Sequence, residues 1–331
     1  MKKAIVTGGG GFVGKAIVRR LIERGIDTAV VGRHRYPDVE NMGAHCFVGD
    51  IRDPQFLSSA FKGYDTVFHV AAKAGIWGDE KKYLSINLNG TENVLEACRA
   101  NNIPRLIYTS TPSVVFNRNS LENVDESAPY ADSFLCHYAA SKVLAEKRVL
   151  AANSTDLLTT ALRPHLVWGP GDNHLIPRLI ERGLKGQLRI VGNGRNRVDI
   201  SYIDNVVDAH LLAADNLATS ATAAGQAYFI SQGHAVNLWN WINDLFKRLS
   251  IPPVKKQIGF KKAYYAGAFL EIVHTLFRLR EEPRMTRFLA EQLAKSHWFS
   301  IHKAYDQLGY SPRVTTEEGM IKVVEWIQGE T

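Results

Sequence analysis

Cysteine, basic clusters and long apolar runs are scarce in this 331-residue sequence, and each scarcity excludes a class of protein. Cys46, Cys98 and Cys136 lie far apart, so we expect no disulfide framework and no metal site, and a reducing, cytoplasmic setting. No block of lysine and arginine is interleaved with aromatic residues, so we expect no nucleic-acid partner. The apolar run after Met1 stops at Thr7, which is too short for a signal peptide.

The overall composition is that of an ordinary globular chain with a mildly basic balance. Hydrophobic residues make up 45% and charged residues 22%, and the length accommodates one large domain or one and a half. The formal net charge of +7 is compatible with an anionic cofactor, an anionic substrate or a membrane surface. It is equally compatible with a compositional bias that serves no specific partner.

A glycine-rich stretch from Thr7 to Gly14 lies between an apolar run at 2–6 and an amphipathic segment at 15–24. Strand, glycine turn and helix together provide a phosphate-binding loop, because glycine lets the backbone approach a pyrophosphate and the helix N-terminus offers free N–H groups. The alternative is a tight turn without a ligand, but four consecutive glycines exceed what such a turn requires. The spacing fits both Gly9/Gly11/Gly14 and Gly8/Gly11/Gly14, and both indicate a dinucleotide.

Strands and helices alternate through the first half of the chain. This alternation predicts a Rossmann-type, doubly wound α/β fold with a parallel sheet. After Arg163-Pro164 the regular alternation of strands and helices ends. We expect a dinucleotide-binding domain at 1–165, to which 198–230 contributes strands. Residues 166–331 are expected to form a smaller, mostly helical substrate-binding part. The expected strands are 27–31, 44–48, 65–69, 105–109, 157–162, 188–191, 198–201 and 227–230, and the expected helices are 54–62, 80–101, 134–153, 173–184, 204–216 and 238–249.

The loop after the second strand lacks the acidic residue that would accept the ribose 2′-hydroxyl of NAD. Arg33 and Arg35 stand there instead and suit the 2′-phosphate of NADP, unless they form a plain basic surface loop. Asp50, after the third strand, is a candidate acceptor for the adenine amino group. Its alternative role is a cap for the next turn, which Asp53 before Pro54 fills more naturally.

Tyr138-Ala-Ala-Ser-Lys142 places a phenol and an ammonium group on one helix face. A neighbouring lysine stabilises a phenolate, lowers the tyrosine pKa and so suits the phenol for proton transfer. By itself the pattern is common on surface helices. It gains weight because it follows Tyr108-Thr-Ser-Thr-Pro-Ser113, a hydroxyl-rich strand end where an open α/β sheet places its ligand.

Together these residues resemble the extended short-chain dehydrogenase/reductases over essentially the whole chain, and this resemblance implies the Gly8/Gly11/Gly14 spacing. The 3β-hydroxysteroid dehydrogenase branch is the most similar one, and within it the bacterial 2-alkyl-3-oxoalkanoate reductases of long-chain olefin biosynthesis. Further motifs that carry the resemblance are His69-Val-Ala-Ala72, Asn87-Leu-Asn-Gly-Thr91, Leu162-Arg-Pro164, Ala72–Gly78, Arg163–Asp172, Asp199–Asn205 and Glu282–Phe288.

The resemblance implies a function and a set of catalytic residues. Tyr138 would protonate the carbonyl oxygen, Lys142 would be its partner, and Thr111 would hydrogen-bond the same oxygen, with Ser110 and Ser113 as alternatives. The expected reaction is the NADPH-dependent reduction of a large apolar ketone, a long-chain 2-alkyl-3-oxoalkanoate, to the 3-hydroxy acid. A 3β-hydroxysteroid or sterol-4-carboxylate 3-dehydrogenase is the alternative, followed by a sugar-nucleotide epimerase or dehydratase.

The expected cofactor is NADP(H), with NAD as the alternative, and the family leads us to expect a homodimer. A non-catalytic NADP sensor is disfavoured because a sensor needs no acid–base pair. The residues expected to bind the cofactor are Gly8, Gly11, Phe12, Val13, Gly14, Arg33, Arg35, Asp50, Ile51, Ala71, Ala72, Asn87, Tyr138, Lys142, Pro164, Leu166 and Val167.

One apolar stretch, 263–279, is too short and too polar to be expected to span a membrane. It has three interpretations: a helix over a greasy substrate cavity, an interfacial membrane helix, or plain core. Four lysines just before it make 255–279 a candidate peripheral membrane contact. His165, His274, Trp77 and Trp168 are candidate substrate contacts, and each has a structural role as its alternative.

Overall fold

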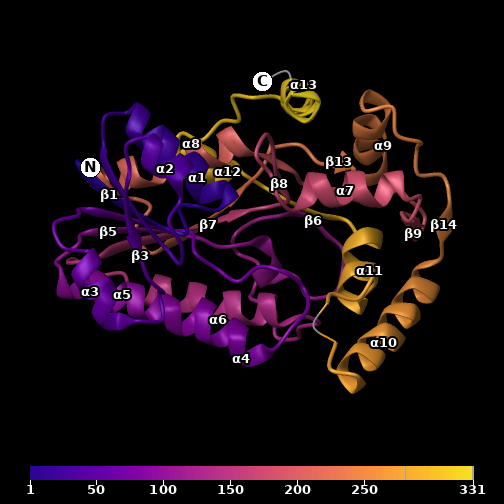
Figure 1. Cartoon of the computed structure of the whole chain (residues 1–331), viewed down its shortest axis with the longest axis horizontal. Coiled ribbons are helices and arrows are strands. Elements are labelled where there is room, and N and C mark those ends of the chain that lie inside the picture. The colour runs from indigo at the N-terminus through magenta and orange to yellow at the C-terminus, as the bar shows by residue number, and fades with distance from the viewer. Residues whose placement is uncertain (280, 330–331) are drawn as a thin grey trace.

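A seven-stranded parallel β-sheet forms the centre of the computed structural model, which describes residues 1–279 and 281–329 (Figure 1). Its strand order, β12-β7-β5-β4-β1-β2-β3, confirms the predicted doubly wound α/β fold. Ala4, Ile5 and Val6 of β1 are fully buried, because helices cover both faces of the sheet. The strands are β1 (Lys3–Thr7), β2 (Asp27–Gly32), β3 (His45–Val48), β4 (Thr66–His69), β5 (Arg105–Thr109), β7 (Leu158–Pro164) and β12 (Gln226–Ile230).

Helices from both halves of the chain form the two covering layers (Figure 1). Helix α8, from the second half, packs against α1 and against β5 and β7, so the second half contributes to the dinucleotide-fold core. One layer contains α3 (Pro54–Ala60), α5 (Gly90–Ala100) and α6 (His137–Ala151), and the other contains α1 (Phe12–Glu23), α8 (Ile203–Ala218) and α12 (His302–Leu308).

The single helix expected at 80–101 is divided into α4 (Glu80–Tyr83), a π-helical segment (Leu84–Asn89) and α5. The wider turn carries Asn87, whose buried side-chain amide hydrogen-bonds to the backbone of Lys73 and to the hydroxyl of Ser141. A periodicity pattern cannot reveal such an insertion, because the tertiary hydrogen bonds that hold it come from distant residues.

Small sheets connect the second half of the chain to the first. The expected strand 198–201 is wrong as a single strand, because β10 (Arg197–Val198) and β11 (Ser201–Tyr202) join different sheets. The mostly helical part expected at 166–331 also contains a strand that was not predicted, β15 (His297–Phe299), which pairs with β10 and with β6 (Leu121–Val124). The other strands are β8 (Val167–Trp168), β9 (Ile190–Val191), β13 (Val236–Asn237) and β14 (Gln257–Ile258), and the other helices are α2 (Pro37–Asn41), a 3₁₀ turn (Pro112–Val115), α7 (Leu175–Leu184), α9 (Leu238–Arg248), α10 (Phe260–Leu276), α11 (Arg287–Ala294) and α13 (Thr316–Gln328).

Helix α10 lies at one edge of the molecule, where it packs on α11 (Figure 1). It begins and ends three residues earlier than the predicted apolar stretch 263–279. Among the described residues, no helix combines the length and apolar character needed to cross a bilayer.

Candidate active site

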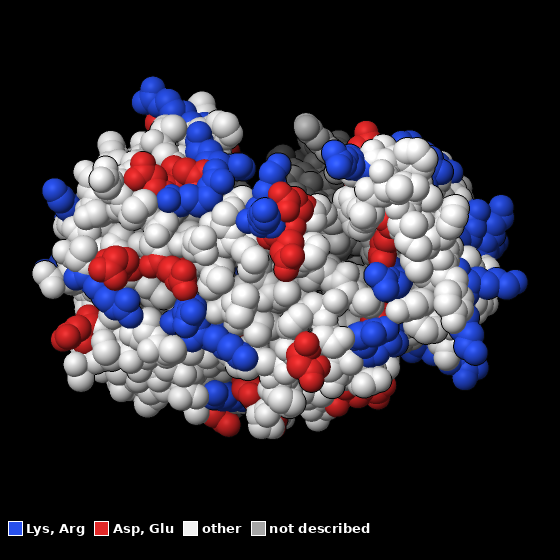
Figure 2. Space-filling model, turned by 90° about the horizontal axis from the view of Figure 1, so that it is seen from below, with Lys and Arg blue, Asp and Glu red and all other residues white. Residues whose placement is uncertain are grey.

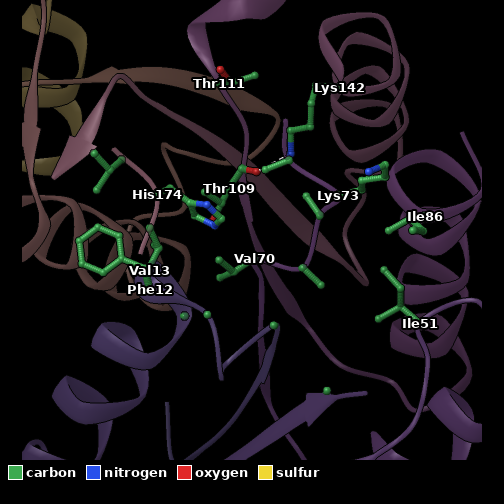
Figure 3. A pocket seen from close by; sticks show the side chains of 18 of the residues that line it. Phe12, Val13, Ile51, Val70, Lys73, Ile86, Thr109, Thr111, Lys142 and His174 are labelled. Atoms are coloured by element: carbon green, nitrogen blue, oxygen red, sulfur yellow. Dashed lines mark hydrogen bonds between the residues drawn. The ribbon is translucent and has the colours of Figure 1, made fainter. Parts of the chain in front are cut away.

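A cavity of about 610 Å³ opens at the carboxyl edge of the sheet, where β1 and β4 are neighbours and the chain order reverses (Figure 3). Open α/β sheets bind their ligands at this switch point. The loops after β1, β2, β3, β4, β5 and β7 contribute to its wall. The fold thereby brings together residues that lie more than a hundred positions apart in the sequence.

The glycine-rich loop forms one wall through Gly8, Gly11 and Gly14. Gly8 has a φ of +73°, and a Cβ atom on it would lie 2.8 Å from the Ala71 backbone. A Cβ on Gly14 would lie 2.3 Å from the Gly8 carbonyl oxygen. A Cβ on Gly11 would have only that oxygen nearby, at 3.3 Å, so Gly11 borders space that a ligand can enter.

The first turn of α1 faces the cavity. Gly11 caps the helix without a side-chain hydrogen bond, and the first turn contains no acidic residue. The free N–H groups and the positive end of the helix dipole suit a pyrophosphate. Phe12 and Val13 of this turn line the cavity (Figure 3). These features, with a glycine wall that admits close backbone approach, fit a dinucleotide.

The two arginines of the basic loop have different environments. Arg33 lines the cavity and forms no ion pair with any residue that the structure describes. The Arg35 guanidinium instead pairs with Glu40, with 3.2 Å between Nε and Oε1, and does not line the cavity. Glu40 follows on α2, a short helix that the sequence pattern did not predict.

Asp50 lines the cavity, but its carboxylate is already engaged by Arg52. Arg52 Nε and Nη2 lie 2.9 and 2.7 Å from the two carboxylate oxygens, and this pairing holds the Asp50 pKa below its usual value. Asp53 caps α3 by accepting from two backbone N–H groups, so the capping role falls to Asp53. Ile51 lines the cavity next to Asp50.

Tyr138, in the first turn of α6, and Thr111, just after β5, lie on the wall of the cavity. Burial raises the pKa of Tyr138 to about 12, and a hydrogen bond with Thr111 acts in the opposite direction. The predicted lowering of the Tyr138 pKa by Lys142 is wrong for this structure, because burial of the phenol dominates. Tyr138 therefore holds its proton at neutral pH.

Lys142 lines the cavity one turn further along α6 and is almost fully buried. Its ammonium group donates to the Tyr108 hydroxyl at 2.6 Å. It also donates to the Thr109 carbonyl oxygen at 2.7 Å (Figure 3). Burial lowers the pKa of Lys142 to about 7, and the charge of Glu146 works against this shift. These two hydrogen bonds direct the Lys142 ammonium at the end of β5.

Glu146 lies one turn beyond Lys142 and is fully buried beside Arg163. Arg163 Nη2 donates to Glu146 Oε1 at 2.5 Å, and the Tyr130 hydroxyl donates to the same oxygen at 2.8 Å. The Leu162-Arg-Pro164 motif is thereby connected to α6. A buried pair of this kind fixes the geometry of the elements that carry it.

Of the cofactor-binding residues predicted in the loops after β4 and β7 and in the segment at 87, most line the cavity and one has a structural role. Ala71, Ala72, Pro164, Leu166 and Val167 line the cavity, as the cofactor prediction expects. Asn87 does not line it: its amide fixes the loop after β4, accepting from Lys73 N at 2.7 Å.

All but one of the remaining candidates, Ser110, lie outside the cavity wall. His165 is buried and stacks on His297 at 4.7 Å between ring centroids, and Trp168 packs on Trp241 in the core. Trp77 and His274 contact each other, and Ser113 accepts a 3.2 Å hydrogen bond from the Thr111 hydroxyl. Ser110 does line the cavity, and its buried hydroxyl has no partner among the described residues.

Sequence patterns did not predict every residue of the cavity wall. Some wall residues have no distinctive side-chain chemistry, and others reach the cavity only because of how the loops fold. Tyr36 is an example: its ring lies against Gly10 and Gly32, where a Cβ would come within 2.1 and 2.3 Å of it. Most of the other missed residues lie next to a predicted motif in the sequence, and this position is the one feature from which they could have been predicted. The missed residues are Val31, Gly32, Tyr36, Gly49, Val70, Lys73, Ala74, Ile86, Thr109, Asp172 and His174.

Comparison with known proteins identifies the family of the chain. The model of the 3-beta hydroxysteroid dehydrogenase/isomerase family matches residues 5–261. The chain is 49% identical to a 2-alkyl-3-oxoalkanoate reductase of Stenotrophomonas maltophilia, covering 96% of this chain and 97% of that protein. It is 34% identical to the sterol-4-alpha-carboxylate 3-dehydrogenase (decarboxylating) of Mus musculus, and the match covers 98% of this chain and 90% of that protein.

Solved structures share the architecture. The crystal structure of gox2253 has a TM-score of 0.81 and 26% identity, covering 100% of this chain and 99% of that chain. MoeE5, solved in complex with UDP-glucose and NAD, has a TM-score of 0.76 and 24% identity, with 99% of both chains covered, and shows the fold alone. The chain therefore belongs to the 3-beta hydroxysteroid dehydrogenase/isomerase family and is an NAD(P)-dependent oxidoreductase of the short-chain dehydrogenase/reductase type.

Proposed function

We propose that the protein reduces the ketone of a large apolar substrate with NADPH, converting a long-chain 2-alkyl-3-oxoalkanoate to the 3-hydroxy acid. The observation that carries this proposal is the common cavity of Tyr138, Thr111 and the glycine-rich loop. Relatives at 49% and 46% identity, from Stenotrophomonas maltophilia and Shewanella oneidensis, are named 2-alkyl-3-oxoalkanoate reductases.

A bound reduced nicotinamide would supply a hydride to the ketone carbon. The Tyr138 phenol donates its proton to the carbonyl oxygen, so that one C–H and one O–H bond form as the C=O bond becomes single. The Thr111 hydroxyl orients the same oxygen. A phenol whose pKa is raised to about 12 is protonated at neutral pH, as a proton donor must be.

Preference for NADPH is supported by Arg33, which lines the cavity without an ion-pair partner among the described residues. A free guanidinium can pair with a 2′-phosphate through two parallel N–H donors. The glycine loop and the α1 N-terminus would hold the pyrophosphate, and Pro164, Leu166 and Val167 would lie against the nicotinamide end.

An apolar substrate is supported by the surroundings of Tyr138. Its ring belongs to an apolar cluster that also contains Phe116, Leu135 and Phe288. A hydrocarbon chain that displaced water from such a surface would be stabilised by the hydrophobic effect.

A sterol-4-carboxylate or 3β-hydroxysteroid 3-dehydrogenase is the second candidate. It is favoured by relatives of that name at 34% and 32% identity over nearly the whole chain. The same tyrosine, lysine and threonine would then act in the oxidative direction. The sugar-nucleotide alternative is supported by structural neighbours at 24% and 22% identity, which share the fold.

Substrate assignment is tested by measuring NADPH oxidation against long-chain 2-alkyl-3-oxo acids, 3-ketosteroids and UDP-sugars. We expect kcat/KM to be highest for the oxo acids and to disappear for them in Tyr138→Phe. A preference for ketosteroids would support the second candidate instead. Turnover of UDP-sugars alone would contradict both.

A further inference from the structure

Lys73, in the loop after β4, lines the wall of the 610 Å³ cavity with a half-buried side chain. Its Nζ lies over the ring of Tyr83, 4.6 Å from the ring centroid. This ammonium group forms no hydrogen bond or ion pair with any residue that the structure describes. A half-buried cation in this situation attracts a negatively charged ligand, because a charge-assisted hydrogen bond would offset its loss of hydration.

The surface cations of the neighbouring helices have a different environment. On the face that α5 and α6 cover, basic side chains lie among acidic ones (Figure 2), and Arg148 pairs with Glu92 at 2.9 Å. Asp79, at the end of the Lys73 loop, accepts a hydrogen bond from the backbone of α4 instead. Lys73 therefore has no carboxylate beside it among the described residues.

The backbone of Lys73 is connected to the helix that carries Tyr138. The Asn87 side chain accepts from Lys73 N at 2.7 Å and donates to Lys73 O at 3.1 Å. The same amide donates to the Ser141 hydroxyl at 2.9 Å, which in turn donates to the Tyr138 carbonyl oxygen at 2.8 Å. These buried contacts fix the position of Lys73 relative to the first turn of α6.

Tyr83 holds the rest of the loop in place. Its hydroxyl oxygen lies 2.9 and 3.0 Å from the carbonyl oxygens of Gly75 and Trp77. Gly75 has a φ of +104°, a conformation that glycine adopts readily, so the loop can curl around the phenol. The Tyr83 ring also lies 6.4 Å from the ring of His137, the residue before Tyr138. The ammonium of Lys73 thus lies near the start of α6.

The anionic groups of the cofactor have other binding positions. The N-terminus of α1 suits the pyrophosphate, and Arg33 suits a 2′-phosphate. Figure 3 shows Lys73 on the side of the cavity where Lys142 lies, away from Phe12 and Val13 of α1. A negative charge that meets Lys73 would therefore belong to the substrate.

We propose that Lys73 binds the carboxylate of the substrate and makes the enzyme selective for ketones with a carboxyl group on the adjacent carbon. The inference rests on the proposed function, in which Tyr138 and Thr111 hold the ketone oxygen. A 2-alkyl-3-oxoalkanoate has its carboxyl group on the carbon next to the ketone, and so does a sterol-4-carboxylate that reacts at carbon 3. The flexible stem of a lysine lets the ammonium follow either carboxylate.

The test compares a long-chain 2-alkyl-3-oxo acid with its methyl ester, which keeps the ketone and both chains but has no charge. NADPH oxidation gives kcat/KM for each compound. For the wild type we expect kcat/KM of the acid to exceed that of the ester about tenfold or more, because an ionised acceptor binds an ammonium more strongly than a neutral one does.

Lys73→Gln removes the charge and keeps most of the side-chain stem. It should lower kcat/KM for the acid about tenfold or more, mainly by raising KM, because the carboxylate contact is the same in the ground state and the transition state. The loss for the ester should not exceed about threefold. Lys73→Arg should recover most of the activity on the acid, since it restores the cation.

Lys82→Gln is the matched control, because Lys82 is exposed on the adjacent helix α4 and does not line the cavity. It should keep the wild-type ratio of kcat/KM between acid and ester. The dissociation constant of NADPH, measured by fluorescence titration, should stay within about threefold in Lys73→Gln. Thermal melting monitored by circular dichroism should show that each variant is folded.

An unchanged kcat/KM for the acid in Lys73→Gln, or equal losses for acid and ester, would overturn the inference. So would a weakened affinity for NADPH, which would assign Lys73 to the cofactor. A wild type that reduces acid and ester equally well would overturn it too, while ketone reduction itself would stand. A wild type that reduces neither compound would contradict the proposed function and this inference with it.

Discussion

Two side chains of the candidate active site respond to burial in opposite directions. Burial raises the pKa of the Tyr138 phenol to about 12 and lowers that of the Lys142 ammonium to about 7, because in each case the charged form is disfavoured. At neutral pH the Tyr138 phenol is therefore protonated and the Lys142 ammonium is close to its titration point.

Tyr138→Phe tests the role of that phenol. We expect kcat to fall at least about a hundredfold, because no other group would protonate the carbonyl oxygen in position. The dissociation constant of NADPH, measured by fluorescence titration, should stay within about threefold, since the ring remains. Undiminished turnover would show that another residue is the donor.

The two arginines of the basic loop provide a matched pair of substitutions. Arg33→Ala should raise the KM for NADPH about tenfold and leave that for NADH nearly unchanged, because only NADPH carries the 2′-phosphate. Arg35→Ala is the control, since the Arg35 guanidinium pairs with Glu40. Equal effects of Arg33→Ala on both cofactors would mean that Arg33 does not bind the 2′-phosphate.

At the level of elements, the contact between the glycine-rich loop and α1 leaves no room for a side chain at position 14. Gly14→Ala would place a methyl group 2.3 Å from the Gly8 carbonyl oxygen, so the helix must move away from β1. We expect the free energy of unfolding to fall by about 1–3 kcal/mol. Cofactor affinity should fall with it.

Chemical denaturation and NADPH titration check this prediction, and Gly259→Ala is its control. Gly259 has a φ of −61°, and a Cβ there would meet no atom within 4 Å. A Gly14→Ala protein with wild-type stability and affinity would show that α1 adjusts without cost.

The sequence predicted the central elements well where local signals agree. The run at 105–109 combines β-forming residues with a following hydroxyl cluster, and β5 occupies the same five residues. Prediction failed where long-range pairing decides the structure: β6 and β15 become strands by pairing with each other across more than 170 residues. Similarly, Arg35 and Asn87 carry suitable chemistry, but Glu40 and Lys73 engage them, and no local pattern reveals those partners.

At the scale of the whole molecule, burial keeps several histidines neutral. Burial lowers the pKa of His69 to about 3 and of His210 to about 4, and His165 and His297 shift in the same direction. The unfolded chain binds these protons at a higher pH than the folded chain does. The contribution of the neutral buried histidines to the unfolding free energy is therefore fully present above about pH 6.5 and is lost as the pH falls toward 4. Each histidine contributes a slope of up to about 1.4 kcal/mol per pH unit.

Between pH 6.5 and 4, His210→Gln should therefore reduce the slope of the unfolding free energy against pH by up to about 1.4 kcal/mol per pH unit. This reduction corresponds to one proton fewer taken up on unfolding. Urea denaturation across that range measures the slope. Exposed His234→Gln is the surface control, which leaves the buried histidines in place. An unchanged slope in His210→Gln would mean that His210 is protonated in the folded protein.

The division into parts at 1–165 and 166–331 and the homodimer stay predictions. The pairing of β7 with β12, and of β6 with β15, crosses that boundary in the sequence. During synthesis β7 can pair with β5 early, but it gains its second neighbour only when the chain has been made as far as Ile230. Strand β6 gains its partner only at Phe299. A strand edge exposed for so long can pair with another chain. Ribosomal pausing or truncation between these positions should consequently produce aggregation rather than a working fragment.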